Sequence, residues 1–228
     1  MSVNQVPPHH LGISPDFLHE KGQIKISTEE MARPPNEELD IFKHDGSHFL
    51  VQSPYTEQDH LLDLRTLDAE NALLARALAR MENLRPDYAT ASYVESFNWN
   101  EILQELERLV RTHGYRWKET SFFIVAFRSQ IPPTTVYEDL GALDKVAHTE
   151  AIASGGFLKY WFGHPDKDGR NLATCLWRSQ EDATKGGVGP GHRKAAAATR
   201  SLYTHWKIDR HRLIIRDDVK NWEIIDWE

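Results

Sequence analysis

The sequence predicts an α+β protein in which a β-α-β-β-α-β core, starting near residue 119, follows an N-terminal helical extension. Three observations predict this order. The run SFFIVAFRS at 121–129 is almost entirely apolar, as a buried strand is. After it, strand-like and helix-like segments alternate, and Gly-Gly or Pro-Pro pairs separate several of them. Before it, the clear apolar periodicity is helical.

Composition narrows the class of protein. The chain has 228 residues, of which 40% are hydrophobic and 27% charged, so a globular core can form. The net charge is -7 without a dense Lys/Arg cluster, which argues against nucleic-acid and membrane-surface binding. The N-terminus MSVNQVPPHHLGISP has no signal-peptide pattern, and the lone Cys175 is compatible with a reducing compartment. We therefore expect a cytoplasmic protein.

The first half of the chain is expected to lie outside the core. Residues 1–60 are rich in proline, histidine and charge, which predicts a mostly irregular arm in which 48–52 could form a short strand. Residues 61–118 are predicted to be a helical extension packed on the core, and 119–228 to be the core domain.

Two helices are predicted in the extension. The first covers 67–83, where Leu and Met recur at helical spacing before Pro86. The second covers 99–112, after Asn98 as the N-cap and before Gly114, which suits the residue just past a helix end.

The core is predicted to hold four strands and two helices. The helices are expected at 134–154, ending before Gly155-Gly156, and at 191–205, entered through the glycine-rich loop KGGVGPG. The tail NWEIIDWE could add an edge strand. This order is the ferredoxin-like split βαβ arrangement, an antiparallel sheet with two helices on one face. The strands are expected at 121–129, 157–163, 171–179 and 206–217.

The other face of the sheet should also be covered. A half-exposed strand alternates apolar and polar residues, but six consecutive residues of 121–129 are apolar. Either the N-terminal helices or a second subunit would cover this face. We favour a second subunit, alone or together with the helices.

Several segments resemble the dimeric α/β-barrel superfamily over about 121–217. They are the last strand WKIDRHRLII, the joint CLWRSQEDA and the later GH before an Ala-rich helix. The resemblance implies ferredoxin-like sheets that pack face to face as a homodimer. It also implies a range of activities, namely cofactor-free monooxygenases, isomerases, cyclases, lyases and some haem enzymes, and fold alone does not choose between them. The segments HTEAIASGGFLKYWFG and RNLATCLWRSQEDA also resemble the sequences of an uncharacterised fungal protein family.

His192 and Glu150 are the first catalytic candidates. His192 is predicted to face inward at the start of its helix, above small residues that leave room for a ligand. The helix N-terminus disfavours added positive charge, so this imidazole is expected to be neutral and able to accept a proton. Glu150 lies near the apolar stripe of 134–154, where burial would raise its pKa and make it a general acid or base. The alternatives are a structural His192 bonded to the loop and a Glu150 that faces solvent or pairs with an arginine.

Other candidates line the same predicted pocket. His148 is a third catalytic candidate, although the helical repeat places it on the flank or surface of its helix. The glycine-rich loop lacks a phosphate-binding pattern, so a mobile lid or a permissive turn is expected there. Residues proposed to bind substrate, with ordinary core packing or turn formation as the alternative, are Tyr160, Trp161, Trp177, Tyr203, Arg170 and Asn171.

The expected function is that of a small-molecule enzyme. It would carry out proton-transfer chemistry, as an isomerase, cyclase, lyase or cofactor-free monooxygenase, on a hydrophobic or aromatic substrate such as a secondary metabolite. No cofactor is expected, because no metal-ligand spacing is present; a metal, or haem on His192, are the alternatives. The other class of function is a non-catalytic ligand-binding or stress-response module whose interior is packed with side chains.

Overall fold

The computed structural model describes residues 40–135 and 137–228, which belong to one compact unit. The arm predicted for 1–60 therefore lies outside the described residues as far as residue 39. In the described part of the arm, β1 (Phe49–Leu50) pairs with β2 (Leu62–Asp63), and a 3₁₀ turn, η1, covers Gln58–His60.

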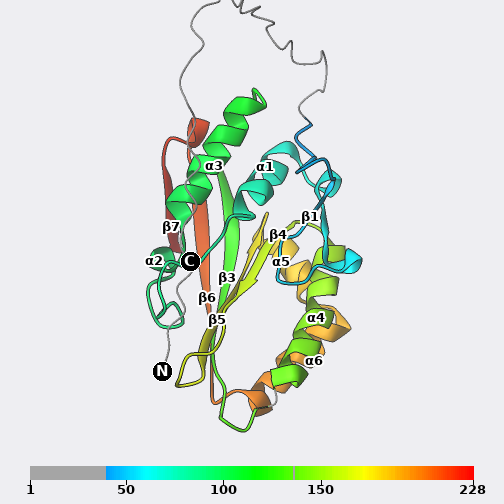
Figure 1. Ribbon diagram of the computed structural model, residues 1–228, viewed down its shortest axis with the longest axis vertical. Helices are drawn as coiled ribbons and strands as arrows, with labels where there is room; N and C mark the ends of the chain where they lie inside the picture. The colour runs from blue at the N-terminus through cyan, green and yellow to red at the C-terminus, as the bar shows by residue number, and fades with distance from the viewer. Residues whose placement is uncertain (1–39, 136) are drawn as a thin grey trace, which may run out of the picture. The chain divides into compact units, whose positions relative to one another are not determined.

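The core is a five-stranded antiparallel sheet in the order β4-β5-β3-β6-β7 (Figure 1). Its first four members, with the helices between them, make the β-α-β-β-α-β order, so the ferredoxin-like fold class is confirmed. β7 is the edge strand that the tail was expected to add. The bounds are β3 (Thr120–Gln130), β4 (Phe157–Phe162), β5 (Arg170–Trp177), β6 (His205–Ile215) and β7 (Trp222–Asp226).

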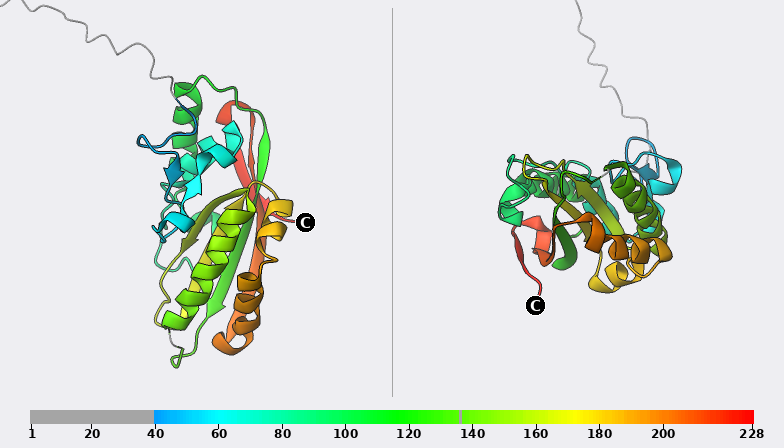
Figure 2. Two further views of the ribbon diagram at one scale, coloured as in Figure 1. Left: turned by 90° about the vertical axis from the view of Figure 1, so that its right-hand side faces the viewer. Right: turned by 90° about the horizontal axis from the view of Figure 1, so that it is seen from below.

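Two long helices cover one face of the sheet. They are α4 (Tyr137–Ser154) and α6 (Pro190–Leu202), which run side by side (Figure 2). The sequence did not predict α5 (Gln180–Gly186), which precedes the glycine-rich loop and ends in its first two residues. Its cap explains it: the Ser179 hydroxyl accepts the backbone N–H of Asp182, so the helix starts directly after β5.

The chain's own extension covers the other face. It contains α1 (Ala69–Leu78), α2 (Tyr93–Ser96) and α3 (Trp99–Thr112), which lie across the sheet from α4 and α6 (Figures 1 and 2). The expectation that a second subunit alone covers this face is therefore wrong, because the apolar sides of α1 and α3 fill it. One buried cluster joins the two layers; it includes Leu74, Ile102 and Leu106 from the helices and Phe122, Ile124, Leu213 and Ile215 from the strands.

A partly buried arginine fixes the extension to the sheet. Arg128 of β3 donates to the carbonyl oxygens of Ala89 and Ala91, at 2.7 and 2.8 Å, and its Nε lies 3.0 Å from Asp209 on β6. A planar guanidinium with five donors suits this division of bonds between a loop and a strand. Within the described ranges, no helix is long and apolar enough to cross a bilayer.

Candidate functional site

A cavity of about 410 Å³ lies between the sheet and helices α4 and α6. β5 turns alternate residues toward it, so Ala173 and Cys175 line it while Leu172 and Leu176 pack on the opposite face. Burial raises the pKa of the Cys175 thiol to about 12, which keeps it protonated and unreactive. Most of the wall is apolar, with a few polar side chains from both helices.

Glu150 and His192 meet where α6 begins. Pro190 stands in the first turn of α6, whose backbone N–H groups point toward α4. Glu150 accepts the N–H of Gly191 at 2.6 Å and that of His192 at 2.9 Å, and its Oε2 lies 3.1 Å from Nδ1 of His192. A Cβ at Gly189 would collide with this carboxylate. The glycines of the loop therefore admit Glu150 to the helix N-terminus.

At this position the pKa of Glu150 shifts in the direction opposite to the one expected from the sequence. The N–H groups of Gly191 and His192, more than the His192 ring, hold the pKa of Glu150 below its usual range. The expectation of a raised pKa is wrong, because the carboxylate lies on the positive end of α6 and not against apolar walls. The same contact fills the place where an anion would bind.

The His192 ring lines the cavity. Its Nδ1 faces Glu150, and among the described residues nothing bonds to Nε2. A carboxylate that binds one imidazole nitrogen orients the ring and leaves the other nitrogen to exchange protons. The structure thus brings together the two residues that the sequence paired.

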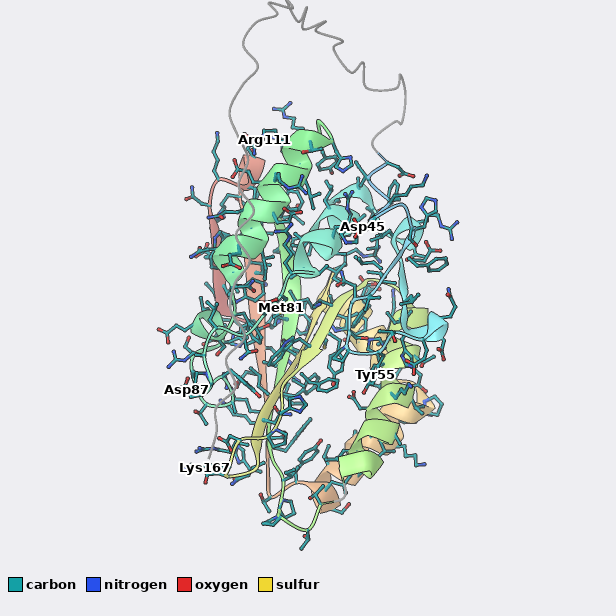
Figure 3. All side chains as sticks on the ribbon, viewed as in Figure 1. Asp45, Tyr55, Met81, Asp87, Arg111 and Lys167 are labelled. Atoms are coloured by element: carbon teal, nitrogen blue, oxygen red, sulfur yellow. The ribbon has the colours of Figure 1, made fainter. Side chains whose placement is uncertain are left out.

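His148 is buried, not on the surface of α4. Its side chain is 4% exposed, and its Nδ1 lies 2.9 Å from Nδ1 of His60. Burial, with a smaller effect from His60, lowers the pKa of His148 to about 4. The expectation of an exposed position is wrong, because the segment 53–60, which precedes the core by many residues, packs against this flank of α4 (Figure 3 labels Tyr55 of this segment).

The sequence interpretation missed Asp144. This residue lies on the inner side of α4 and lines the cavity, where it accepts the Tyr55 hydroxyl at 2.6 Å and the Tyr160 hydroxyl at 2.7 Å. Burial raises its pKa above the usual range, although both hydroxyls act in the opposite direction. The helical repeat could have found it, because Asp144 falls between Leu140 and Ala147 on the predicted apolar stripe.

The predicted substrate-binding residues divide into two groups. Trp161 does not reach the cavity, because the register of β4 turns it to the opposite face, against Tyr88 and Phe97. Arg170 does not either, because Asp166 and Asp168 hold its guanidinium in the turn. The ones that line the cavity are Tyr160, Trp177, Tyr203 and Asn171.

Three stacked aromatic rings form one wall, and two of them were not predicted. Trp206 lies between Tyr203 and Phe127, with ring centroids at 5.0 and 5.6 Å and planes tilted by 25° in both pairs. Trp206 is also 38% exposed, so this end of the cavity reaches solvent. In the described part of the chain, no group of three His, Cys, Asp or Glu side chains is arranged to hold a metal ion.

Comparison with known proteins places the chain in a family. The model of the PB2B2.08-like family matches residues 51–226. The UPF0643 protein PB2B2.08 of Schizosaccharomyces pombe is 38% identical over 187 residues, which are 76% of this chain and 82% of the relative. The chain belongs to the PB2B2.08-like family. The resemblance to a fungal family is thereby confirmed, and the PB2B2.08-like match includes the extension as well as both cavity helices.

Solved structures of the ferredoxin-like type resemble smaller parts of this PB2B2.08-like chain. SnoaB, a cofactor-independent oxygenase from Streptomyces nogalater, has a TM-score of 0.35 and 16% identity over 39% of this chain and 89% of its own. Rv0793 from Mycobacterium tuberculosis has a TM-score of 0.35 and 19% identity over 39% and 91%. A putative antibiotic biosynthesis monooxygenase from Nitrosomonas europaea has a TM-score of 0.34 and 10% identity over 49% and 93%. Likeness at this level carries no argument about activity.

Proposed function

We propose that the protein is a small-molecule enzyme that removes a proton from a hydrophobic or aromatic substrate bound between the sheet and helices α4 and α6. The observation that carries the proposal is the contact between His192 and Glu150. An imidazole on the cavity wall lies 3.1 Å from a carboxylate that two backbone N–H groups hold in place.

The contact supports a base at His192. The ring donates its Nδ1–H to Glu150, which leaves the Nε2 lone pair to take a proton from carbon, and the carboxylate stabilises the imidazolium that forms. Isomerisation, cyclisation, elimination and cofactor-free oxygenation can all begin with this step. We propose that the protein's own residues perform it without a tightly bound cofactor.

The walls support a flat, apolar substrate. Trp206, stacked between Tyr203 and Phe127, offers an aromatic surface at the open end of the cavity. Aromatic walls with few polar groups are typical of small-molecule pockets. A secondary metabolite with fused rings is a substrate of this shape.

Three further statements are part of the proposal. The domain division is 1–60, 61–118 and 119–228, with the middle part acting as a permanent cover of the sheet. The protein works in the cytoplasm. If it forms a homodimer, the contact uses the free edge of β7, because α1 and α3 occupy the face by which sheets would pack.

Deuterium exchange of 2-tetralone, a flat bicyclic ketone with acidic C–H groups, tests the activity. Quenching of tryptophan fluorescence measures its binding, and proton NMR in D₂O follows the loss of its C1 protons. We expect the wild-type protein to accelerate exchange and His192→Gln to abolish the acceleration while binding the ketone equally well. Binding without acceleration would overturn the enzyme and favour the binding module. Absence of binding would refute the open apolar cavity on which the proposed enzyme rests.

A further inference from the structure

Helix α4 carries two carboxyl groups in opposite surroundings. Glu150 lies on the N-terminus of α6, whereas Asp144 lines the cavity. They are six residues apart, or about 9 Å along the helix. His192 is close enough to both to affect them electrostatically. Burial favours a proton on Asp144, whereas Glu150 stays ionised beside His192, so the two carboxyl groups suit different tasks in one site: a proton donor, and a carboxylate that orients the base.

Asp144 has hydroxyl partners but no cationic one. Tyr55 and Tyr160 donate to its two oxygens, and no lysine or arginine of the described residues forms an ion pair with it. The nearest lysine, Lys145, pairs with Glu57 at the surface. The ionisable groups that face Asp144 from the surrounding elements are Tyr55 and His60 from the segment 53–60, His148 from α4, Tyr160 from β4, Cys175 from β5 and His192 from α6.

We propose that Asp144 is the general acid of the reaction in which His192 is the base, and that the substrate is a ketone or related carbonyl compound whose oxygen binds Asp144. This inference rests on the proposed function and deepens it, because it assigns the substrate class and a second catalytic residue. The enzyme would convert the carbonyl compound to its enol.

The bonds balance without an oxidant or a cofactor. His192 Nε2 takes a proton from the carbon next to the carbonyl group, and the C–H electron pair becomes the carbon–carbon double bond. The electron pair of the carbonyl group takes the proton from Asp144, so one C–H bond and one carboxyl O–H bond break while an N–H and an enol O–H form. The reverse transfers restore both residues when the enol returns to the ketone.

The neighbours of Asp144 suit this role. Burial raises the pKa of Tyr160 well above its usual range, so this phenol stays a donor and does not compete for the substrate proton. Burial also raises the pKa of Asp144, which increases the fraction that carries a proton. A protonated carboxyl group beside a phenol is a known way to stabilise an enolate oxygen in an apolar site.

The test uses the full chain, 2-tetralone and the variants Asp144→Asn and Asp144→Leu. Asparagine keeps the shape and a hydrogen-bond donor but cannot transfer a proton, so we expect the exchange rate to fall roughly 100-fold or more with little change in the Kd of the ketone. Asp144→Leu should weaken binding of the ketone but not binding of tetralin, the hydrocarbon that lacks the carbonyl oxygen. The wild-type rate should decline above the raised pKa of Asp144, and Asp144→Asn should lack this decline. Asp45→Asn, at an exposed turn, is the matched control.

The outcomes separate the two proposals. Wild-type exchange that needs His192 but is unchanged in Asp144→Asn would overturn the role of Asp144 and leave the proposed function intact. If Asp144→Asn lowered Tm and weakened the binding of 2-tetralone and of tetralin alike, the role of Asp144 would be structural and the inference would again be wrong. If the wild-type protein itself did not accelerate exchange, the proposed function would be refuted.

Discussion

Oε2 of Glu150 lies 2.9 Å from the backbone nitrogen of His192 and 3.1 Å from Nδ1 of its ring. One carboxylate from α4 therefore stabilises the start of α6 and orients the histidine that follows. Because the same atom does both, the two effects can be separated only by measuring stability and activity on the same variants.

Glu150→Gln should lower Tm in a pH-dependent way. The pKa of Glu150 is lower in the folded protein than its ordinary value of 4.5, so its contribution to stability is complete above pH 4.5 and disappears as pH falls through the lower folded value. We expect a Tm difference from wild type at pH 7 that closes in acid. Thermal unfolding followed by circular dichroism measures it, with exposed Glu181→Gln as the control. A difference that persists in strong acid would contradict the interpretation.

His148 should make the protein less stable in mild acid. Its folded pKa of about 4 lies below the ordinary value of 6.5, so the unfolded chain binds the proton more readily and stability falls as pH decreases from 6.5 to 4. The loss from this group should approach about 3 kcal/mol, since each pKa unit corresponds to about 1.4 kcal/mol. Urea unfolding across this range should show the loss in wild type but not in His148→Gln. If the free energy of unfolding of wild type and His148→Gln changed in parallel with pH, the assignment of this loss to His148 would be wrong.

The two hydroxyls that bind Asp144 should be energetically coupled. Tyr55→Phe and Tyr160→Phe each remove one donor, and each should lower the free energy of unfolding by about 1–2 kcal/mol at neutral pH. The double variant should lose more than the sum, because an Asp144 carboxyl group without donors in an apolar wall is more costly than one with a single donor. A double-mutant cycle in urea measures this coupling, and strict additivity would show that the two tyrosines do not act on a shared group.

Arg128→Lys should loosen the extension from the sheet. Lysine cannot reach two carbonyl groups and a carboxylate at once, so we expect a loss of about 2–4 kcal/mol in the free energy of unfolding. Hydrogen exchange should show the damage first in the loop around Ala89 and Ala91, which accept from Arg128. Arg170→Lys, at the partly exposed start of β5 and away from the extension, is the control. Uniform loss of protection over the whole sheet would contradict a role in attaching the extension.

Local patterns predicted the elements well. The helix at 99–112 has the same bounds in the structure, and Gly114, which follows the C-cap His113, has the expected positive φ of 60°. The strands were placed within about two residues, because apolar runs bounded by glycine or proline are local signals. α5 was missed, because this short helix, which begins from the Ser179 cap, runs directly into the glycine-rich loop at Lys185 and Gly186.

The site was predicted in part for the same reason. The facing sides of α4 and α6 follow from helical periodicity, which brought out His192 and Glu150. The same periodicity also places Asp144 on the inner face of α4, although the sequence interpretation did not single it out as a site residue. The partners Tyr55 and His60 had no signal, because they are some ninety residues away in the chain and only packing brings them to α4.

The order of strands and helices, the layer of helices over the sheet, and the inward positions of Glu150 on α4 and His192 on α6 could all be read from the sequence. These features depend on the spacing of apolar and polar residues within a single helix or strand, which is a local property of the sequence. Tertiary structure alone decided which layer covers the second face, which way the pKa of Glu150 moves and which buried groups surround Asp144. These depend on contacts between distant segments, because burial and charge at one residue are set by whatever the fold places against it.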